Sequence, residues 1–123
     1  MSTPVPGVAT AQEPDFSNWN AGFLVVNPLA NTLLVQSAPL GAGIYHVALV
    51  GWASIDARFR FARRNVADSA DIKNVDVPVP ANNPVSLTMP TIVEIAEGET
   101  FKITNLSSVT GTVQASLLYA RVG

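Results

Sequence analysis

Residues 43–64 read GIYHVALVGWASIDARFRFARR, and their side chains alternate with the period of two that β-strands require. Residues 43–56 are apolar on both faces of the strand that they predict. Residues 57–64 alternate phenylalanine with arginine, which is typical of a half-buried strand. The odd-numbered apolar face continues from one part into the other, so the pattern predicts either one long bent strand or two strands joined by a tight turn near Asp56.

A strand that is apolar on both faces either lies in the centre of two stacked layers or has its outer face against another subunit. The remaining runs are short and end at turn residues such as Asn27-Pro28, which is the spacing of a sandwich or barrel. Residues 75–80 alternate Val with Asp or Pro and predict an edge strand. Ile92–Ile95, Phe101–Asn105 and Thr112–Val122 predict a three-stranded antiparallel meander.

Residues 1–20 contain three prolines and no apolar period, and they predict an extended N-terminal arm. Phe16 and Trp19 would anchor this arm on an apolar surface of its own domain or of another chain. Residues 21–123 then form a single domain. The predicted fold is all-β, an antiparallel β-sandwich that is jelly-roll-like and has eight to nine strands.

Charged residues make up only 13% of the chain, against about 25% in typical soluble domains. Because subunit interfaces replace charged surface with apolar and small polar groups, this deficit predicts an oligomer or an assembly component. The net charge of -2 argues against direct binding of nucleic acid. No apolar stretch is long enough for a membrane span, and the N-terminus does not have the pattern of a secretory signal.

The inventory of reactive side chains is small, with no cysteine and His46 as the single histidine. We therefore expect no enzyme, no catalytic residue, no metal site and no cofactor. Asp68 with Asp71, or the glutamates at 94, 97 and 99, could offer oxygen ligands to calcium, but their spacing matches no calcium loop. Asn105-Leu106-Ser107 matches the N-glycosylation pattern, which is common by chance and is disregarded without a secretory signal.

Four of the seven basic side chains lie within residues 58–64. Arginines in such a cluster can clamp carboxylates of a partner through paired hydrogen bonds. In the alternative interpretation the cluster is a solvated strand face, or is paired within the chain to Asp56, Asp68 or Asp71. That alternative is slightly favoured, because basic residues on edge strands also discourage aggregation.

The segments LLVQSAPLGAGIYHV (33–47), ARFRFARRN (57–65), EIAEGETFKITNL (94–106) and TGTVQASLLYA (110–120) together resemble small β-sandwich proteins of tailed bacteriophages. Head decoration or cement proteins are the most similar of these. The resemblance implies a structural protein that binds the outside of an icosahedral capsid as a dimer or trimer and cements neighbouring shell subunits. The contact residues that residue type then favours are Phe16, Trp19, Trp52, Arg58, Arg60, Arg63 and Arg64.

This resemblance implies two partners, the chain itself and the major capsid protein, and a location on the outer surface of a virion after synthesis in the host cytoplasm. A receptor-binding or carbohydrate-binding jelly-roll module, such as a fibre head or a lectin-like adhesin, is the alternative. In that case Trp52, Tyr45 and several asparagines would line a shallow groove. A cupin-like enzyme is a distant third, since that fold usually brings two or three histidines to a metal.

Overall fold

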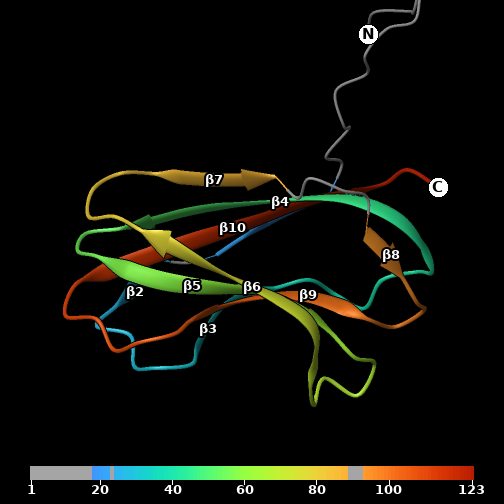
Figure 1. The fold of residues 1–123 in the computed structure, drawn as a ribbon, viewed down its shortest axis with the longest axis horizontal. Coiled ribbons are helices and arrows are strands. Elements are labelled where there is room, and N and C mark those ends of the chain that lie inside the picture. The colour runs from blue at the N-terminus through green and yellow to red at the C-terminus, as the bar shows by residue number, and fades with distance from the viewer. Residues whose placement is uncertain (1–17, 23, 89–92) are drawn as a thin grey trace, which may run out of the picture.

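The computed structural model describes residues 18–22, 24–88 and 93–123, and all regular structure in this part of the chain is β (Figure 1). Every pairing between strands is antiparallel. The strands are β1 (Asn18–Ala21), β2 (Val25–Val26), β3 (Thr32–Gln36), β4 (Gly43–Ala53), β5 (Ala57–Arg64), β6 (Asp71–Val79), β7 (Val85–Thr88), β8 (Val93–Ile95), β9 (Thr100–Asn105) and β10 (Thr112–Arg121).

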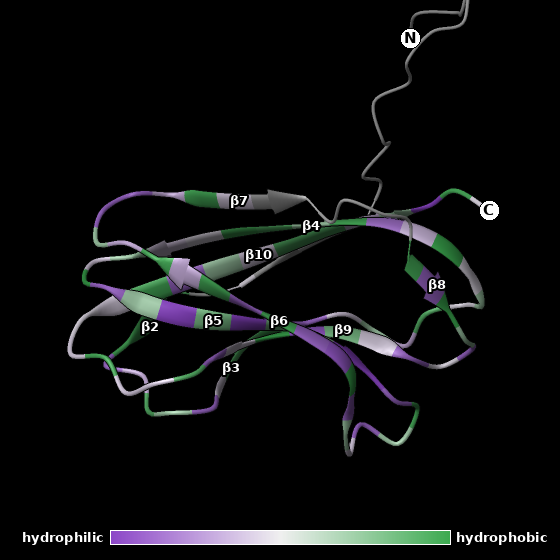
Figure 2. Ribbon diagram, viewed as in Figure 1, coloured by the Kyte–Doolittle hydropathy of each residue, from purple (hydrophilic) through white to green (hydrophobic). Residues whose placement is uncertain are grey.

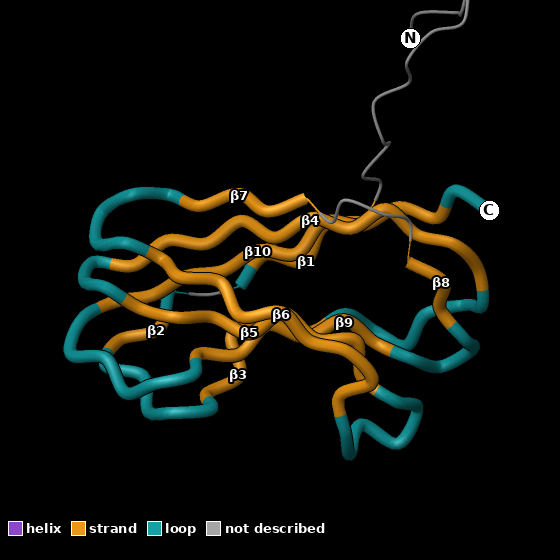
Figure 3. The backbone as a smooth tube through the Cα atoms, in the orientation of Figure 1, coloured by secondary structure: helices purple, strands orange, loops and turns teal. Residues whose placement is uncertain are grey.

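These strands form two sheets that face each other across one core (Figure 3). Sheet A has the order β1-β10-β4-β7, with β2 beside β10 and β8 beside β4, and sheet B has the order β3-β9-β5-β6. Because β1 and β2 pair with the same edge of β10, and β7 and β8 with the same edge of β4, the ten segments occupy eight strand positions. This is the jelly-roll sandwich that the sequence pattern predicted.

The predicted meander in the last third of the chain is wrong, although its strands exist. β8 belongs to sheet A, β9 to sheet B and β10 to sheet A again. β9 pairs with β3 and β5, and β10 pairs with β1, β2 and β4. The short connections therefore cross between the two layers instead of turning back beside the preceding strand, and each strand still places one face in the common core.

The junction between β4 and β5 also crosses from sheet A to sheet B. Residues 54–56 carry the chain between the layers, so β4 and β5 form neither a continuous strand nor a hairpin. The inward face is preserved through the crossing, because Ala53 and Ala57 on either side of it are both buried. β6 lies at the edge of sheet B, as its prolines predicted.

β1 changes the predicted domain boundary. Its residues pair with β10, from Asn18 opposite Tyr119 to Ala21 opposite Ser116. The sandwich therefore begins no later than Asn18, and the prediction of an arm extending to residue 20 is wrong for its last three residues. The pairing uses backbone groups, which an Asn- and Ala-containing segment supplies without any apolar period. Residues 1–17, including Phe16, lie outside the described residues.

The core is filled by the inward faces of both sheets. Leu49, Phe59, Phe101, Ile103 and Leu117 have no exposed surface. Toward the β3–β4 end of the sandwich, four aromatic rings pack with centroid separations of 5.7 to 6.3 Å in the contacting pairs Tyr45–Phe101, Tyr45–Tyr119, Phe61–Phe101 and Phe101–Tyr119. These rings join strands of both layers into a single cluster.

Two buried polar side chains, Tyr45 and Asn105, donate hydrogen bonds to backbone carbonyl oxygens. The hydroxyl group of Tyr45 donates to the carbonyl oxygen of Gly41 at 2.7 Å. Burial raises the pKa of the Tyr119 hydroxyl, with a smaller contribution from Tyr45. Asn105 is fully buried, and its Nδ2 donates to the carbonyl oxygens of Leu29 (3.2 Å) and Ser107 (2.6 Å). The side chain that the glycosylation pattern marks is therefore a structural part of the interior.

Gly51 lets the two sheets approach each other near the β4–β5 end of the sandwich. It lies on the inward face of β4, and a Cβ added there would stand 2.9 Å from the ring of Phe59. That distance is shorter than carbon atoms tolerate, and a ring without exposed surface has little room to move. A small residue on β4 thus accommodates a large residue on β5.

We expect Gly51→Ala to destabilise the fold by about 1–3 kcal/mol through overpacking. Urea unfolding followed by tryptophan fluorescence measures this loss. Gly41→Ala is the matched control, because a Cβ at Gly41 would meet only the Tyr45 hydroxyl oxygen, at 4.0 Å. Equal unfolding midpoints for Gly51→Ala and the wild type would contradict the proposed contact.

Candidate protein interface

Among the described residues, most charged side chains lie on sheet B or at the end of the sandwich that carries the β8–β9 turn. The outer face of sheet A instead carries apolar and small polar side chains on its two central strands, β4 and β10. Figure 2 shows hydrophilic positions recurring along β5 and β6 of sheet B. We call the outer face of sheet A the uncharged face, defined by Ile44, His46, Ala48, Val50, Trp52, Thr112, Gln114, Ser116, Leu118 and Ala120.

The larger apolar groups of the uncharged face remain accessible in the isolated chain. Ile44 is 38% exposed and Val50 is 40% exposed, while Trp52 and Leu118 are half-buried. Glu94, which pairs with Ile44, stands at the rim of the face. Apolar surface of this extent without charges is typical of surfaces that proteins bury on association.

Two polar side chains along this face already have hydrogen-bond partners within the chain. The Nε2 of Gln114 donates to the carbonyl oxygen of Gly22 at 3.1 Å. At the end of β4, the hydroxyl oxygen of Ser54 accepts a hydrogen bond from the backbone nitrogen of Thr112 at 2.8 Å. Covering such satisfied groups costs less free energy than covering groups that depend on water.

The outer face of sheet B is organised by ion pairs. Arg60 holds Asp76 through two hydrogen bonds, Nε to Oδ1 at 2.8 Å and Nη2 to Oδ2 at 3.1 Å. Arg64 reaches Asp68 and Asp71, each at 2.8 Å. The hydrogen bond from Arg60 lowers the pKa of Asp76, and that from Arg64 lowers the pKa of Asp68. The same bonds raise the pKa of both guanidinium groups.

Arg63 forms a different kind of pair, at the β8–β9 turn. Its Nε and Nη2 donate to Oε1 of Glu99 at 3.1 and 2.7 Å, and the backbone nitrogen of Ala96 donates to the same oxygen at 2.6 Å. The Glu99 side chain is only 7% exposed. This carboxylate therefore fastens the turn between the two sheets to the end of β5.

The arginine cluster is thus largely paired within the chain, which confirms the favoured alternative for Arg64 with Asp68 and Asp71. The partners Asp76 and Glu99 were not predicted. Asp56 forms none of these ion pairs; its Oδ1 accepts a hydrogen bond from the backbone nitrogen of Ala81 at 2.9 Å.

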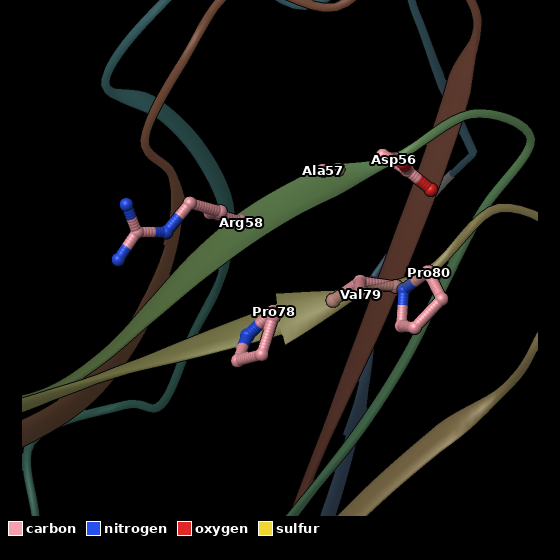
Figure 4. A pocket seen from close by; sticks show the side chains of 6 residues that line it. All are labelled: Asp56, Ala57, Arg58, Pro78, Val79 and Pro80. Atoms are coloured by element: carbon pink, nitrogen blue, oxygen red, sulfur yellow. The ribbon is translucent and has the colours of Figure 1, made fainter.

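Among the described residues, no carboxylate is hydrogen-bonded to Arg58. Arg58 is exposed beside a shallow hollow that Asp56, Ala57, Pro78, Val79 and Pro80 also line (Figure 4). The hollow has a volume of about 280 Å³ and lies at the open edge of sheet B.

The predicted contact residues that the structure describes do not gather in one patch. Trp52 lies on the uncharged face, and Trp19 is opposite Leu118 in the pairing of β1 with β10. The arginines belong to β5 of sheet B. The residues that sequence reasoning did not select are Ile44, Val50 and Leu118, although the apolar character of both faces of residues 43–56 already pointed to the first two. A role of all seven in partner binding stays a prediction.

No three His, Cys, Asp or Glu side chains within residues 18–22, 24–88 and 93–123 are placed to hold a metal ion together. The described part of the chain also contains no helix long and apolar enough to cross a membrane.

No known family model and no curated protein matches the sequence. Solved structures do share its fold. The globular domain of zebrafish complement 1qA is 10% identical, with 85% of this chain and 97% of that chain covered and a TM-score of 0.50. A chain of the human norovirus GI.7 Houston strain virus-like particle is 9% identical, with 92% of this chain and 32% of that chain covered and a TM-score of 0.51. The present chain thus spans about a third of the norovirus chain, and both similarities concern the fold alone.

We expect Glu99→Gln to cost about 2 kcal/mol or more, because it leaves the half-buried Arg63 without its counter-charge. Asp76→Asn breaks a more exposed pair and should cost less than about 1 kcal/mol. Urea unfolding of both variants at pH 7 measures the difference. Equal losses would show that Glu99 does not fasten the β8–β9 turn.

The lowered pKa values of Asp68 and Asp76 also predict how stability depends on pH. A carboxylate with a folded-state pKa below its ordinary value of 3.8 stabilises the fold above that value. This contribution is lost as the pH falls through the lower, folded-state pKa. Thermal melts between pH 7 and pH 2 should therefore show a decline below about pH 4 that is shallower in Asp76→Asn. An identical acid decline in that variant would contradict the assignment.

Proposed function

We propose that the protein is a non-enzymatic structural component of a virion, which binds the outside of an icosahedral capsid as a homo-oligomer and cements neighbouring shell subunits. The division of its surface carries this proposal. One sheet presents the uncharged face, and the other presents arginines held by aspartates. A structural module needs a surface that it can bury against protein and another that stays in water, and the two sheets meet these needs separately.

Sheet B suits the solvent-facing side. Its ion pairs, Arg60 with Asp76 and Arg64 with Asp68 and Asp71, keep charges of both signs on the surface without leaving a large field of either sign. Burying them would require desolvation of the charges, which their mutual attraction does not always offset. The uncharged face has no such cost.

Bridging between subunits also requires contacts beyond one face. The loops at the β2–β3 and β4–β5 end of the sandwich expose Leu29 (72%) and Ile55 (39%), close to Val26 (64%) in β2. These side chains offer a second apolar surface, next to the uncharged face, on which a shell protein can pack. The jelly-roll fold supports the same function, since viral shells are commonly built from such sandwiches.

The position of the single histidine supports a non-enzymatic role. His46 stands on the outer face of sheet A between Ile44 and Ala48, with Ala120 opposite it on β10. These neighbours supply neither a nucleophile nor a carboxylate to orient the imidazole. A flat sheet face with apolar neighbours is a packing environment, and His46 fits it as a packed residue.

Binding to empty capsids of tailed bacteriophages tests the proposal. The purified chain should co-sediment with a capsid that it recognises and should raise the melting temperature of that capsid. Leu29→Asp should weaken this binding, because it places a charge on the apolar loop surface. Val66→Asp is the matched control, since Val66 is 65% exposed and lies at the opposite end of the sandwich.

Failure to bind any capsid, together with sugar binding that Trp52→Ala abolishes, would replace this proposal with the carbohydrate-binding module. Loss of capsid binding in Val66→Asp but not in Leu29→Asp would contradict the role of the apolar loops.

A further inference from the structure

We infer that the uncharged face is the surface on which two copies of this chain meet, sheet A against sheet A, in a two-fold symmetric dimer. The inference rests on the homo-oligomer of the proposed function and names the surface that forms it. A two-fold contact uses the same patch on both partners, so that patch must be complementary to itself.

The charge pattern satisfies this condition. The two central strands present no formally charged side chain to a second copy, so no like charges are brought together. Glu94 lies at the rim, where it can remain in water. Because an uncharged patch gains no electrostatic preference for a charged partner, an identical patch is its best match in charge.

The side chains also suit the packing of one sheet face on another. Small and large side chains alternate across the pairing of β4 with β10, because Ala48 is opposite Leu118, Ser116 is opposite Val50 and Ala120 is opposite His46. Alternation of large and small groups lets two faces interdigitate at the spacing of about 10 Å found between packed sheets. The exposed Val50 would lose its remaining contact with water in such a dimer.

The available area is close to the lower end of what stable interfaces bury. β4 has 11 residues and β10 has 10. With about 4.8 Å between strands and about 3.4 Å per residue, the strands of sheet A cover a flat footprint of about 550 Å². That footprint is close to the roughly 600 Å² that each partner buries in the smallest specific interfaces.

The other surfaces of the sandwich are less suited to a second copy. The outer face of sheet B would require burial of the Arg60–Asp76 and Arg64–Asp68 pairs. At the edge of that sheet, β6 contains Pro78, which has no N–H group to donate to an added strand. A second copy therefore gains most from sheet A.

The test is the mass of the purified chain, measured by size-exclusion chromatography with light scattering. The wild type should have twice the chain mass of 13.0 kDa, which is 26.0 kDa. Val50→Lys should shift the protein to 13.0 kDa, because it places a charge on both contacting faces. The lysine can reach solvent in a monomer from a position that is 40% exposed, so the variant should retain its circular dichroism spectrum.

Leu33→Lys is the matched control. Leu33 is 48% exposed and lies on the outer face of sheet B, opposite Thr104 of β9, so this variant should remain at 26.0 kDa. A second measurement uses Val50→Lys mixed with Val50→Glu. Each variant alone should be monomeric, and the mixture should regain the dimer mass because opposite charges then meet across the two-fold contact.

A wild-type mass of 13.0 kDa overturns the inference, as does a dimer that Leu33→Lys dissociates and Val50→Lys leaves intact. The capsid experiment tests the proposed function independently of the dimer. A monomer that still binds and stabilises capsids disproves the dimer alone. A dimer that Val50→Lys dissociates but that binds no capsid supports the dimer and removes the capsid function.

Discussion

The fold depends on the contact between Gly51 of β4 and Phe59 of β5, which joins the two sheets close to the β4–β5 crossing. The chain crosses between the two layers several times, and the crossing at residues 54–56 keeps the same set of side chains facing inward. Every later strand is placed by this arrangement, because each must cover the same core from one side or the other. The aromatic cluster around Phe101 closes the interior at the β3–β4 end.

Alternation along the sequence was sufficient to find most strands but not their partners. β4, β5 and the edge strand β6 follow from period-two patterns that each segment carries alone. The prediction of a meander was wrong because a short loop that turns back and a short loop that crosses the core have the same turn residues. Similarly, Asp68 and Asp71 are near Arg64 in sequence and were foreseen, whereas Glu99 lies 36 residues from Arg63 and is brought to it only by the fold. The uncharged face was half predicted, since the strand in residues 43–56 showed two apolar sides and nothing local identified Leu118 as its neighbour.

Segregation of charge gives the two sheets different physical tasks. Arginine–aspartate pairs on sheet B keep one side of the sandwich hydrated, and sheet A is left with groups that water solvates weakly. The low content of charged residues is therefore not spread evenly over the surface. Charged side chains are scarce on the uncharged face, and this scarcity lowers the desolvation cost of contact with another protein there.

The pairing of β1 with β10 has a consequence for how the chain reaches its native state. Asn18 pairs with Tyr119, and the two strands beside β10 in sheet A come from the first half of the sequence. During synthesis the strand that joins them is therefore missing until almost all of this sequence has left the ribosome. The apolar face of β4 has no neighbour at this position until β10 has been synthesised, so the sandwich can complete its fold only after residues 112–121 have left the ribosome.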